Sequence, residues 1–239
     1  MARKPRFTLP GYPQHIIQRG LNRQACFFAI KDYRLYLELL QEASDKYECH
    51  VHAYVLMTNH VHLLVTPQQS LGISFMMQRL AQRYVRSINR NYGRTGTLWD
   101  GRYKAGLVDT GAYLLTCMRY IELNPVRANM VSHPAEYPWS SYRHNGGACQ
   151  DKVIKPHPLY KQLDKCLKNR CAIYRRMFAT HIEQDTLDQI RDTLNMELAL
   201  GSAAFRKQVE TLSGRQTERK PVGRPRNKNG VNKRVSEHR

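Results

Sequence analysis

Apolar positions in the first part of the chain switch between the two spacings that distinguish strands from helices. Alternation with a period of two, or a short run of β-formers, predicts strands at 13–19, 50–57, 60–66 and 102–109. A period near 3.6 predicts helices at 32–47, 71–92 and 110–123, and Asp32 can cap the first of these. Because only Thr58 and Asn59 separate the two middle strands, they form an antiparallel hairpin.

The resulting order is βαββαβ followed by one more helix, which is the split βαβ arrangement of ferredoxin-like α+β domains. This arrangement places two helices on one face of an antiparallel sheet and leaves the other face for a third helix or a ligand. The pattern weakens after Pro125 and helical spacing returns only over 157–212. We therefore expect a domain over 1–150, a helical region over 151–212, and a disordered basic tail over 213–239.

Charge narrows the class of partner. The 239 residues carry a net charge of +19 and the pI is near 9.9, which excludes an ordinary neutral metabolic enzyme and favours a nucleic-acid partner. An apolar fraction of 41% suffices for a core. No apolar run reaches the ~20 residues of a membrane span, so we expect a soluble, cytoplasmic protein associated with the nucleoid. The six cysteines form no CxxC pair, which argues against structural zinc.

Two histidines in the hairpin are the first candidate for chemistry. His60 and His62 stand at i and i+2 of a strand, so their side chains lie on one face while Val61 and Leu63 point to the other. Two imidazoles on one face can chelate a divalent ion, although the same pattern is common on a polar sheet face.

The helix at 110–123 adds a tyrosine and an amide to this picture. Tyr113, Cys117, Tyr120 and Asn124 recur at the spacing of one helix face, so Tyr120 and Asn124 lie together. Pro125 is expected to end the helix and to leave the amide at its last turn. On these residues alone, Tyr120 can equally be a packing residue and Asn124 a cap.

Four motifs in order resemble one family of enzymes. HIIQRGLNR, MTNHVHLL, GTLWDGRYKAGLVD and RYIELNPVRA over residues 7–145 are similar to the single-tyrosine HUH transposases, and most similar to the REP-associated tyrosine transposase branch. The resemblance implies a ferredoxin-like or RRM-like catalytic domain. It also implies that His60 and His62 are metal ligands, that Tyr120 is the nucleophile, and that Asn124 presents its amide near the metal.

This set of residues is suited to phosphoryl transfer. Two histidines and an oxygen ligand fit Mg²⁺ or Mn²⁺ with positions left for phosphate oxygens. Attack by Tyr120 leaves a 5′-phosphotyrosine and a free 3′-OH, and a second 3′-OH can reverse the step. The expected function is cleavage and rejoining of single-stranded or hairpin DNA, with short repeated palindromes as targets. The enzyme works as a monomer or as a homodimer that supplies the tyrosine in trans.

Basic residues define the expected DNA contacts. One face of the helix at 71–92 carries arginines without interleaved acids, which indicates phosphate contacts or a solvated face. The segment around the last strand combines aromatic and basic side chains, as single-strand binding requires, although Trp99 can also be a core residue. The candidates are Arg79, Arg83, Arg86, Arg90, Trp99, Arg102, Tyr103, Lys104 and Arg19, with Arg23 and Arg127 as further ones.

The tail adds a second kind of basic surface. It holds nine Lys/Arg against two Glu, and Lys220–Arg226 resembles an AT-hook core in which Arg224 and Arg226 would enter a minor groove. A non-specific basic anchor is the alternative.

Three other functions compete with the transposase. A domesticated DNA-binding regulator would keep the fold and charge without catalysis. A relaxase or rolling-circle initiator would need a second nucleophilic tyrosine or a longer histidine cluster. A metal-dependent hydrolase would depend on His60 but not on Tyr120.

Overall fold

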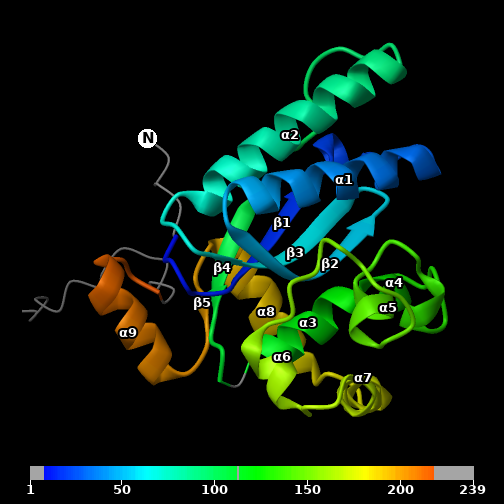
Figure 1. Cartoon of the computed structure of the whole chain (residues 1–239). Coiled ribbons are helices and arrows are strands. Elements are labelled where there is room, and N and C mark those ends of the chain that lie inside the picture. Colours follow the sequence, from blue (N-terminus) through cyan, green and yellow to red (C-terminus); the bar gives the residue numbers. More distant parts are fainter. Residues whose placement is uncertain (1–7, 112, 218–239) are drawn as a thin grey trace, which may run out of the picture.

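A five-stranded sheet forms the centre of the molecule (Figure 1). The computed structural model describes residues 8–111 and 113–217. Across the sheet the order is β2-β3-β1-β4-β5, and only the pair β4 and β5 is parallel. The first four of these strands have the predicted ferredoxin-like order, which confirms the α+β fold class. The strands are β1 (Gln14–Arg19), β2 (Cys49–Met57), β3 (His60–Pro67), β4 (Lys104–Val108) and β5 (Ala199–Leu200).

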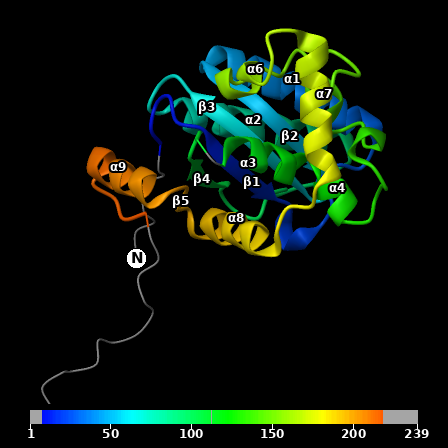
Figure 2. The ribbon, with the colours of Figure 1, turned by 90° about the horizontal axis from the view of Figure 1, so that it is seen from below.

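Helices cover both faces of this sheet. On one face lie α1 (Ile30–Lys46) and α2 (Gly72–Asn91), and their apolar sides form one core with the strands. On the other face, α3 (Leu114–Glu122) lies over the strands with α7 (Leu167–Arg176) and α8 (Gln184–Met196) beside it (Figure 2). Because both faces are covered, the hairpin strands are buried along nearly their whole length and read as apolar runs.

The remaining elements are short or lie at the periphery. They are η1 (Leu21–Arg23), α4 (Asn124–Arg127), η2 (Pro134–Glu136), α5 (Tyr142–Asn145), α6 (Pro158–Gln162), η3 (Met177–Ala179) and α9 (Ala203–Ser213). Helix α9 packs through Phe205 and Val209 against Leu107 at the edge of the sheet.

The predicted helix cap at Asp32 and the predicted turn at Thr58 and Asn59 are both present, although the cap acts from a different position in the helix. Asp32 caps α1 from its third position rather than from the N-cap, because its carboxylate accepts the backbone N–H groups of Phe28 and Ala29 at 2.9 Å each. The turn between β2 and β3 consists of Thr58 and Asn59, as predicted, so Met57 pairs with His60.

The expectation that the chain leaves the helical conformation at Asn124 is wrong. Asn124 and Pro125 begin the next helical turn, α4, and Pro125 occupies its first turn, where the missing N–H is tolerated. The Asn124 side-chain amide donates to the carbonyl oxygens of Tyr120 at 2.9 Å and Ile121 at 3.1 Å. The amide nitrogen thus supplies the donor that Pro125 cannot offer to Ile121.

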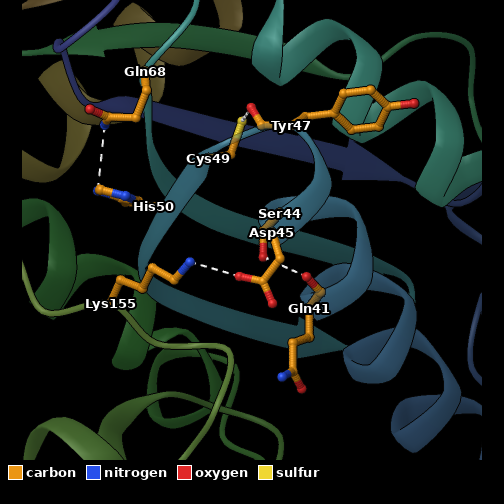
Figure 3. Close-up of polar contacts among 8 residues, drawn as sticks. All are labelled: Gln41, Ser44, Asp45, Tyr47, Cys49, His50, Gln68 and Lys155. Carbon is orange, nitrogen blue, oxygen red and sulfur yellow. Dashed lines mark hydrogen bonds and ion pairs between the residues drawn. The ribbon is translucent and has the colours of Figure 1, made fainter.

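The chain after residue 150 contacts the first part closely. Lys155 forms an ion pair with Asp45 at the end of α1, 2.7 Å between Nζ and Oδ1 (Figure 3). Its carbonyl oxygen lies 2.6 Å from Nδ1 of the buried His52. Strand β5, which the sequence pattern does not predict, extends the sheet beside β4. The boundary near residue 150 stays a prediction.

Two further observations concern the helices and the C-terminal end of the described residues. Among residues 8–111 and 113–217, no helix combines the length and the apolar character needed to cross a bilayer. Residues 214–217 fold back on α9, where the Thr217 backbone N–H donates to the Glu210 carboxylate at 2.8 Å. The basic tail from residue 218, with Arg224 and Arg226, lies outside the described residues.

Candidate active site

The predicted nucleophile and the two predicted metal ligands come together in the structure. His60 and His62 project from β3 on the face that α3 covers, and Tyr120 of α3 points toward them. The ring centroids of His60 and His62 are 5.1 Å apart, and those of His62 and Tyr120 are 5.9 Å apart in an edge-on arrangement. Residues 60 sequence positions apart therefore form one cluster, because α3 packs against β2 and β3.

A third histidine belongs to this cluster. His15 of β1 stands opposite Leu64 of β3, two residues along the strand from His62. The Nε2 atom of His15 lies 2.8 Å from Nδ1 of His62. Its ring also meets Tyr120 edge-on, with centroids 5.6 Å apart. The side chain is only 2% exposed. His15 therefore contacts both a predicted ligand and the predicted nucleophile without being open to solvent.

The hydrogen bonds of the site hold one nitrogen of each predicted ligand. Nδ1 of His60 lies 2.7 Å from Oδ1 of Asn59, so Nδ1 carries the proton and Nε2 keeps its lone pair. The Asn59 amide in turn donates to the carbonyl oxygen of Arg23 at 3.0 Å, which fixes its orientation. Nδ1 of His62 is hydrogen-bonded to Nε2 of His15, and the Nε2 atom of His62 has no hydrogen-bond partner among the described residues. Outer partners of this kind are what metal-binding histidines require.

The turn after β1 is strained where it supports this arrangement. Asn22 and Arg23 both have positive φ, 51° and 59°, a conformation that costs free energy in residues other than glycine. Gly20 is required for close packing, because a Cβ there would lie 2.2 Å from the Gln24 carbonyl oxygen. The turn thus presents the Arg23 carbonyl to Asn59.

Burial keeps the imidazoles neutral. It lowers the pKa of His15 to about 3 and, with the nearby Arg19 charge, that of His60 to about 4. The pKa of His62 falls well below its usual value through burial and through the neighbouring His15, His60, Arg19 and Arg127. Neutral imidazoles are the form that binds metal ions, so these residues fit a divalent cation.

A guanidinium group lies on the candidate nucleophile. The Arg127 Cζ is 4.4 Å from the centroid of the Tyr120 ring, within the range of a cation–π contact. Arg127 Nη1 is buried and has no hydrogen-bond partner in the part of the chain that the structure describes. A buried donor without a partner beside a nucleophile is a position where an anionic substrate group can be bound.

Asn124 has one side-chain atom that remains available to a ligand. Both carbonyl groups described above occupy its amide nitrogen, so the carbonyl oxygen is the atom left for a ligand. An amide oxygen suits Mg²⁺ or Mn²⁺. No group of three His, Cys, Asp or Glu side chains with metal-binding geometry occurs in the described part of the chain.

A buried carboxylate anchors the helix that carries Tyr120. Glu122 accepts hydrogen bonds from Ser141 at 2.6 Å, Asn145 at 2.8 Å and Tyr174 of α7 at 2.7 Å. Burial raises its pKa to about 7, against the lowering effect of these three donors. The network fixes α3 to the C-terminal helices two residues after Tyr120.

The predicted DNA contacts fall into two groups. Three cavities follow the end of β1: one of about 270 Å³ at Arg19, Arg23, Asn59 and His60, one of about 80 Å³ that includes Arg19, Arg102 and Lys104, and one of about 410 Å³ that includes Trp99, Arg102 and Tyr103. The arginines of α2 line none of them. Arg83 instead pairs with Glu42 of α1, which the helix pattern alone did not reveal. Arg79, Arg86 and Arg90 remain predicted contacts.

Two site residues were missed by the sequence analysis, His15 and Asn59. His15 shares a strand face with Arg19, but only the pairing of β1 with β3 places it beside His62. In the sequence, Asn59 has the character of a turn residue, and only its position next to His60 indicates that it could support the site. Neither role follows from spacing, because both depend on contacts between segments distant in sequence.

Comparison with known proteins gives one family and one fold. Residues 10–124 match the family model described as "Transposase IS200 like". No curated protein matches the chain. The structure of a REP-associated tyrosine transposase bound to a REP hairpin is similar with a TM-score of 0.54 and 14% identity, over 66% of this chain and 93% of that chain. A second structure, described as a provisionally assigned transposase, comes from Deinococcus radiodurans R1. It matches with a TM-score of 0.35 and 18% identity, over 54% of this chain and 92% of that chain.

Proposed function

This chain belongs to the IS200-like transposase family, and we propose from this premise that it is a tyrosine transposase that cleaves and rejoins single-stranded or hairpin DNA. The observation that carries the proposal is the convergence of Tyr120, His62 and His60 on one covered face of the sheet. The hairpin bound by the similar REP-associated transposase supports palindromic DNA as the substrate class.

Each residue has a defined part in the proposed reaction. His60 and His62, through their free Nε2 atoms, and Asn124, through its amide oxygen, would hold Mg²⁺ or Mn²⁺. When bound, the ion polarises the scissile phosphate. The Tyr120 hydroxyl gives its proton to solvent and its oxygen attacks phosphorus. The bond to the 3′ oxygen breaks, that oxygen takes up a proton and leaves as a free 3′-OH, and the phosphate becomes a 5′-phosphotyrosine. Arg127 stabilises the negative charge that develops on the phosphate oxygens.

The same residues account for rejoining. Because the phosphotyrosine ester retains the energy of the broken bond, a 3′-OH from another strand can displace Tyr120 and restore a phosphodiester. The tyrosine regains its proton, and no nucleotide cofactor is needed. Transfer between strands would then move a short DNA segment.

A covalent-adduct assay tests the proposal. Labelled hairpin oligonucleotides with single-stranded flanks and Mn²⁺ should give a protein–DNA adduct that survives denaturing electrophoresis. Tyr120→Phe should abolish the adduct. Tyr113→Phe, a change at the start of the same helix, is the matched control and should leave it intact.

Other outcomes would assign another function. An adduct that persists in Tyr120→Phe would place the nucleophile elsewhere. Cleavage that needs His60 but not Tyr120 would indicate a hydrolase. Steeply salt-dependent hairpin binding without cleavage in either metal would indicate a DNA-binding regulator.

A further inference from the structure

The part of the chain after residue 124 has no place in the chemistry described so far. The family match ends at that residue, yet the following segment packs on the side of the sheet that carries Tyr120. Buried side chains of α6, α7 and α8 share one apolar core with α3, and Figure 2 shows α7 and α8 beside it. A contact between this segment and α3 therefore bears on the position of Tyr120.

One residue on each side of Tyr120 attaches α3 to this segment. Arg119 donates from Nη2 to the carbonyl oxygen of Thr180, and its guanidinium lies 5.9 Å from the centroid of the Phe178 ring. Glu122 is fully buried. Each residue of a helix turns by about 100°, so Arg119 and Glu122 share a face that points away from the face of Tyr120. The helix is thus held from behind while Tyr120 faces the histidines.

The Glu122 carboxylate accepts hydrogen bonds from three neutral donors. Its Oε1 accepts from Ser141 at 2.6 Å and from Asn145 at 2.8 Å, and its Oε2 accepts from the Tyr174 hydroxyl at 2.7 Å. Within residues 8–111 and 113–217, Glu122 forms no ion pair. A buried carboxylate without a cation depends on these bonds, because each lost donor leaves an acceptor unpaired. The place of Glu122 is therefore closely determined.

Two of the three donors are also bonded to β2. Ser141 Oγ accepts the backbone N–H of Tyr54 at 2.9 Å, and the Asn145 amide donates to the carbonyl oxygen of His52 at 3.2 Å. In the ladder between β2 and β3, Tyr54 is one pair away from His62. Glu122 thus connects the helix of the candidate nucleophile to the strand beside a predicted metal ligand.

The third donor connects α3 to the C-terminal helices. Tyr174 of α7 is fully buried, and its ring meets those of Tyr160 and Phe178 edge-on, with centroids 5.3 and 5.2 Å away. Tyr160 in turn donates to the carbonyl oxygen of Asn145 at 2.5 Å. The rings around Tyr174 therefore also support a second donor of Glu122, so α6 and α7 act on this carboxylate together.

We propose that Glu122 is a positioning residue for the nucleophile, through which the segment after residue 124 holds Tyr120 against the two histidines. The inference rests on the proposed function, because it takes Tyr120 as the nucleophile. In-line attack needs the hydroxyl oxygen about 3–3.5 Å from phosphorus, and a displacement of about 1 Å can slow a reaction about 100-fold. Glu122 touches neither DNA nor metal in this role and affects only the place of the attacking atom.

The test removes one hydrogen bond of the network and keeps the packing. Tyr174→Phe deletes the hydroxyl and retains the ring. Glu122→Gln keeps an oxygen for the other two donors, but its amide nitrogen cannot accept from Tyr174. Tyr137→Phe is the matched control, because Tyr137 is also a buried tyrosine after residue 124, and its hydroxyl donates at 2.8 Å to Leu56 of β2 rather than to α3.

Two readouts are taken for each variant. The first is the rate constant of adduct formation with hairpin DNA and Mn²⁺ at saturating protein, compared with the dissociation constant of the same hairpin in EDTA. The second needs no activity: 3-fluorotyrosine replaces Tyr120, and its ¹⁹F signal reports the rings and the charge around position 120. Circular dichroism shows whether each variant is folded at the temperature of the measurements.

The expected result separates the rate from binding. Tyr174→Phe and Glu122→Gln each slow adduct formation about 10-fold and shift or broaden the ¹⁹F signal, whereas both bind the hairpin as tightly as the unmodified protein. The double variant is no slower than the slower single variant, because both changes break the same contact. Tyr137→Phe leaves the rate, the hairpin affinity and the ¹⁹F signal unchanged.

Two results would overturn the proposal. In one, the rates and ¹⁹F signals of Tyr174→Phe and Glu122→Gln equal those of Tyr137→Phe, which leaves the network a part in stability alone. In the other, rate and hairpin affinity fall together, so the change is not confined to the nucleophile. If Glu122→Gln does not fold, Tyr174→Phe decides. If the unmodified protein forms no adduct, the proposed function fails, and the ¹⁹F signal still decides whether Glu122 positions Tyr120.

Discussion

Replacing His15 by alanine should weaken metal binding without removing any predicted metal ligand. His15 Nε2 lies 2.8 Å from Nδ1 of His62. For His62 to bind a metal ion through Nε2, its proton must stay on Nδ1, and His15 is the acceptor that would hold it there. Without it, the His62 ring can rotate or take the other tautomer. Loss of an outer partner of a metal-binding histidine lowers affinity by about 10- to 100-fold, or about 1.4–2.7 kcal/mol.

The assay is titration of the folded protein with Mn²⁺, and binding is measured by calorimetry or from the EPR signal of free Mn²⁺. His15→Gln keeps a side-chain acceptor and should recover part of the lost affinity. His52→Ala is the matched control, because His52 of β2 is another buried histidine with hydrogen bonds on both nitrogens, to Lys155 and Thr66. It should change stability but not Mn²⁺ affinity.

The reasoning would be refuted if His15→Ala bound Mn²⁺ within about threefold of the unmodified protein, below the effect of losing an outer partner. It would also be refuted if His15→Ala, His15→Gln and His52→Ala lost the same affinity, because general destabilisation would then explain the effect. Circular dichroism of each variant shows whether it is folded under the conditions of the titration.

Three further predictions follow from the structure. Burial lowers the pKa of His52 to about 3, so below pH 6.5 the unfolded chain binds a proton that the folded chain excludes. The free energy of unfolding therefore decreases as the pH is lowered, and in His52→Gln the decrease between pH 6.5 and 5, measured by urea unfolding, should be smaller by about 2 kcal/mol. Arg127→Ala should slow single-turnover adduct formation about 100-fold while Mn²⁺ affinity stays unchanged, and equal rates would contradict its contact with the phosphate. Truncation after Thr217 should weaken hairpin binding and reduce its salt dependence while leaving single-turnover cleavage at saturating protein nearly unchanged, and a collapse of that cleavage would give the tail a part in the chemistry.

The fold could be predicted because its signals are local. Hydrophobic spacing and the two-residue turn at Thr58 and Asn59 determine the order of strands and helices, and this order leaves few topologies open. Strand β5 could not be predicted, because two residues carry no periodicity and Ala199 and Leu200 become a strand only by pairing with β4. The continuation of the helix through Pro125 also depends on a contact, the Asn124 amide that replaces the missing N–H.

The sequence by itself determined which residues of the candidate site share a strand or a helix face. His60 and His62 lie on one side of β3 because strand geometry has a period of two, and Tyr120 and Asn124 lie on one side of a helix because four residues make about one turn. The family motifs contain these same residues.

Only the tertiary structure decided what surrounds them. Packing of α3 on the sheet brings Tyr120 to the histidines, pairing of β1 with β3 brings His15 to His62, and α4 lays Arg127 on the Tyr120 ring. Likewise, only the fold brings Arg19 and Arg102 together at one cavity near the end of β1. Such contacts join residues far apart in the chain, and their geometry comes from the packing of whole elements rather than from any spacing along the sequence.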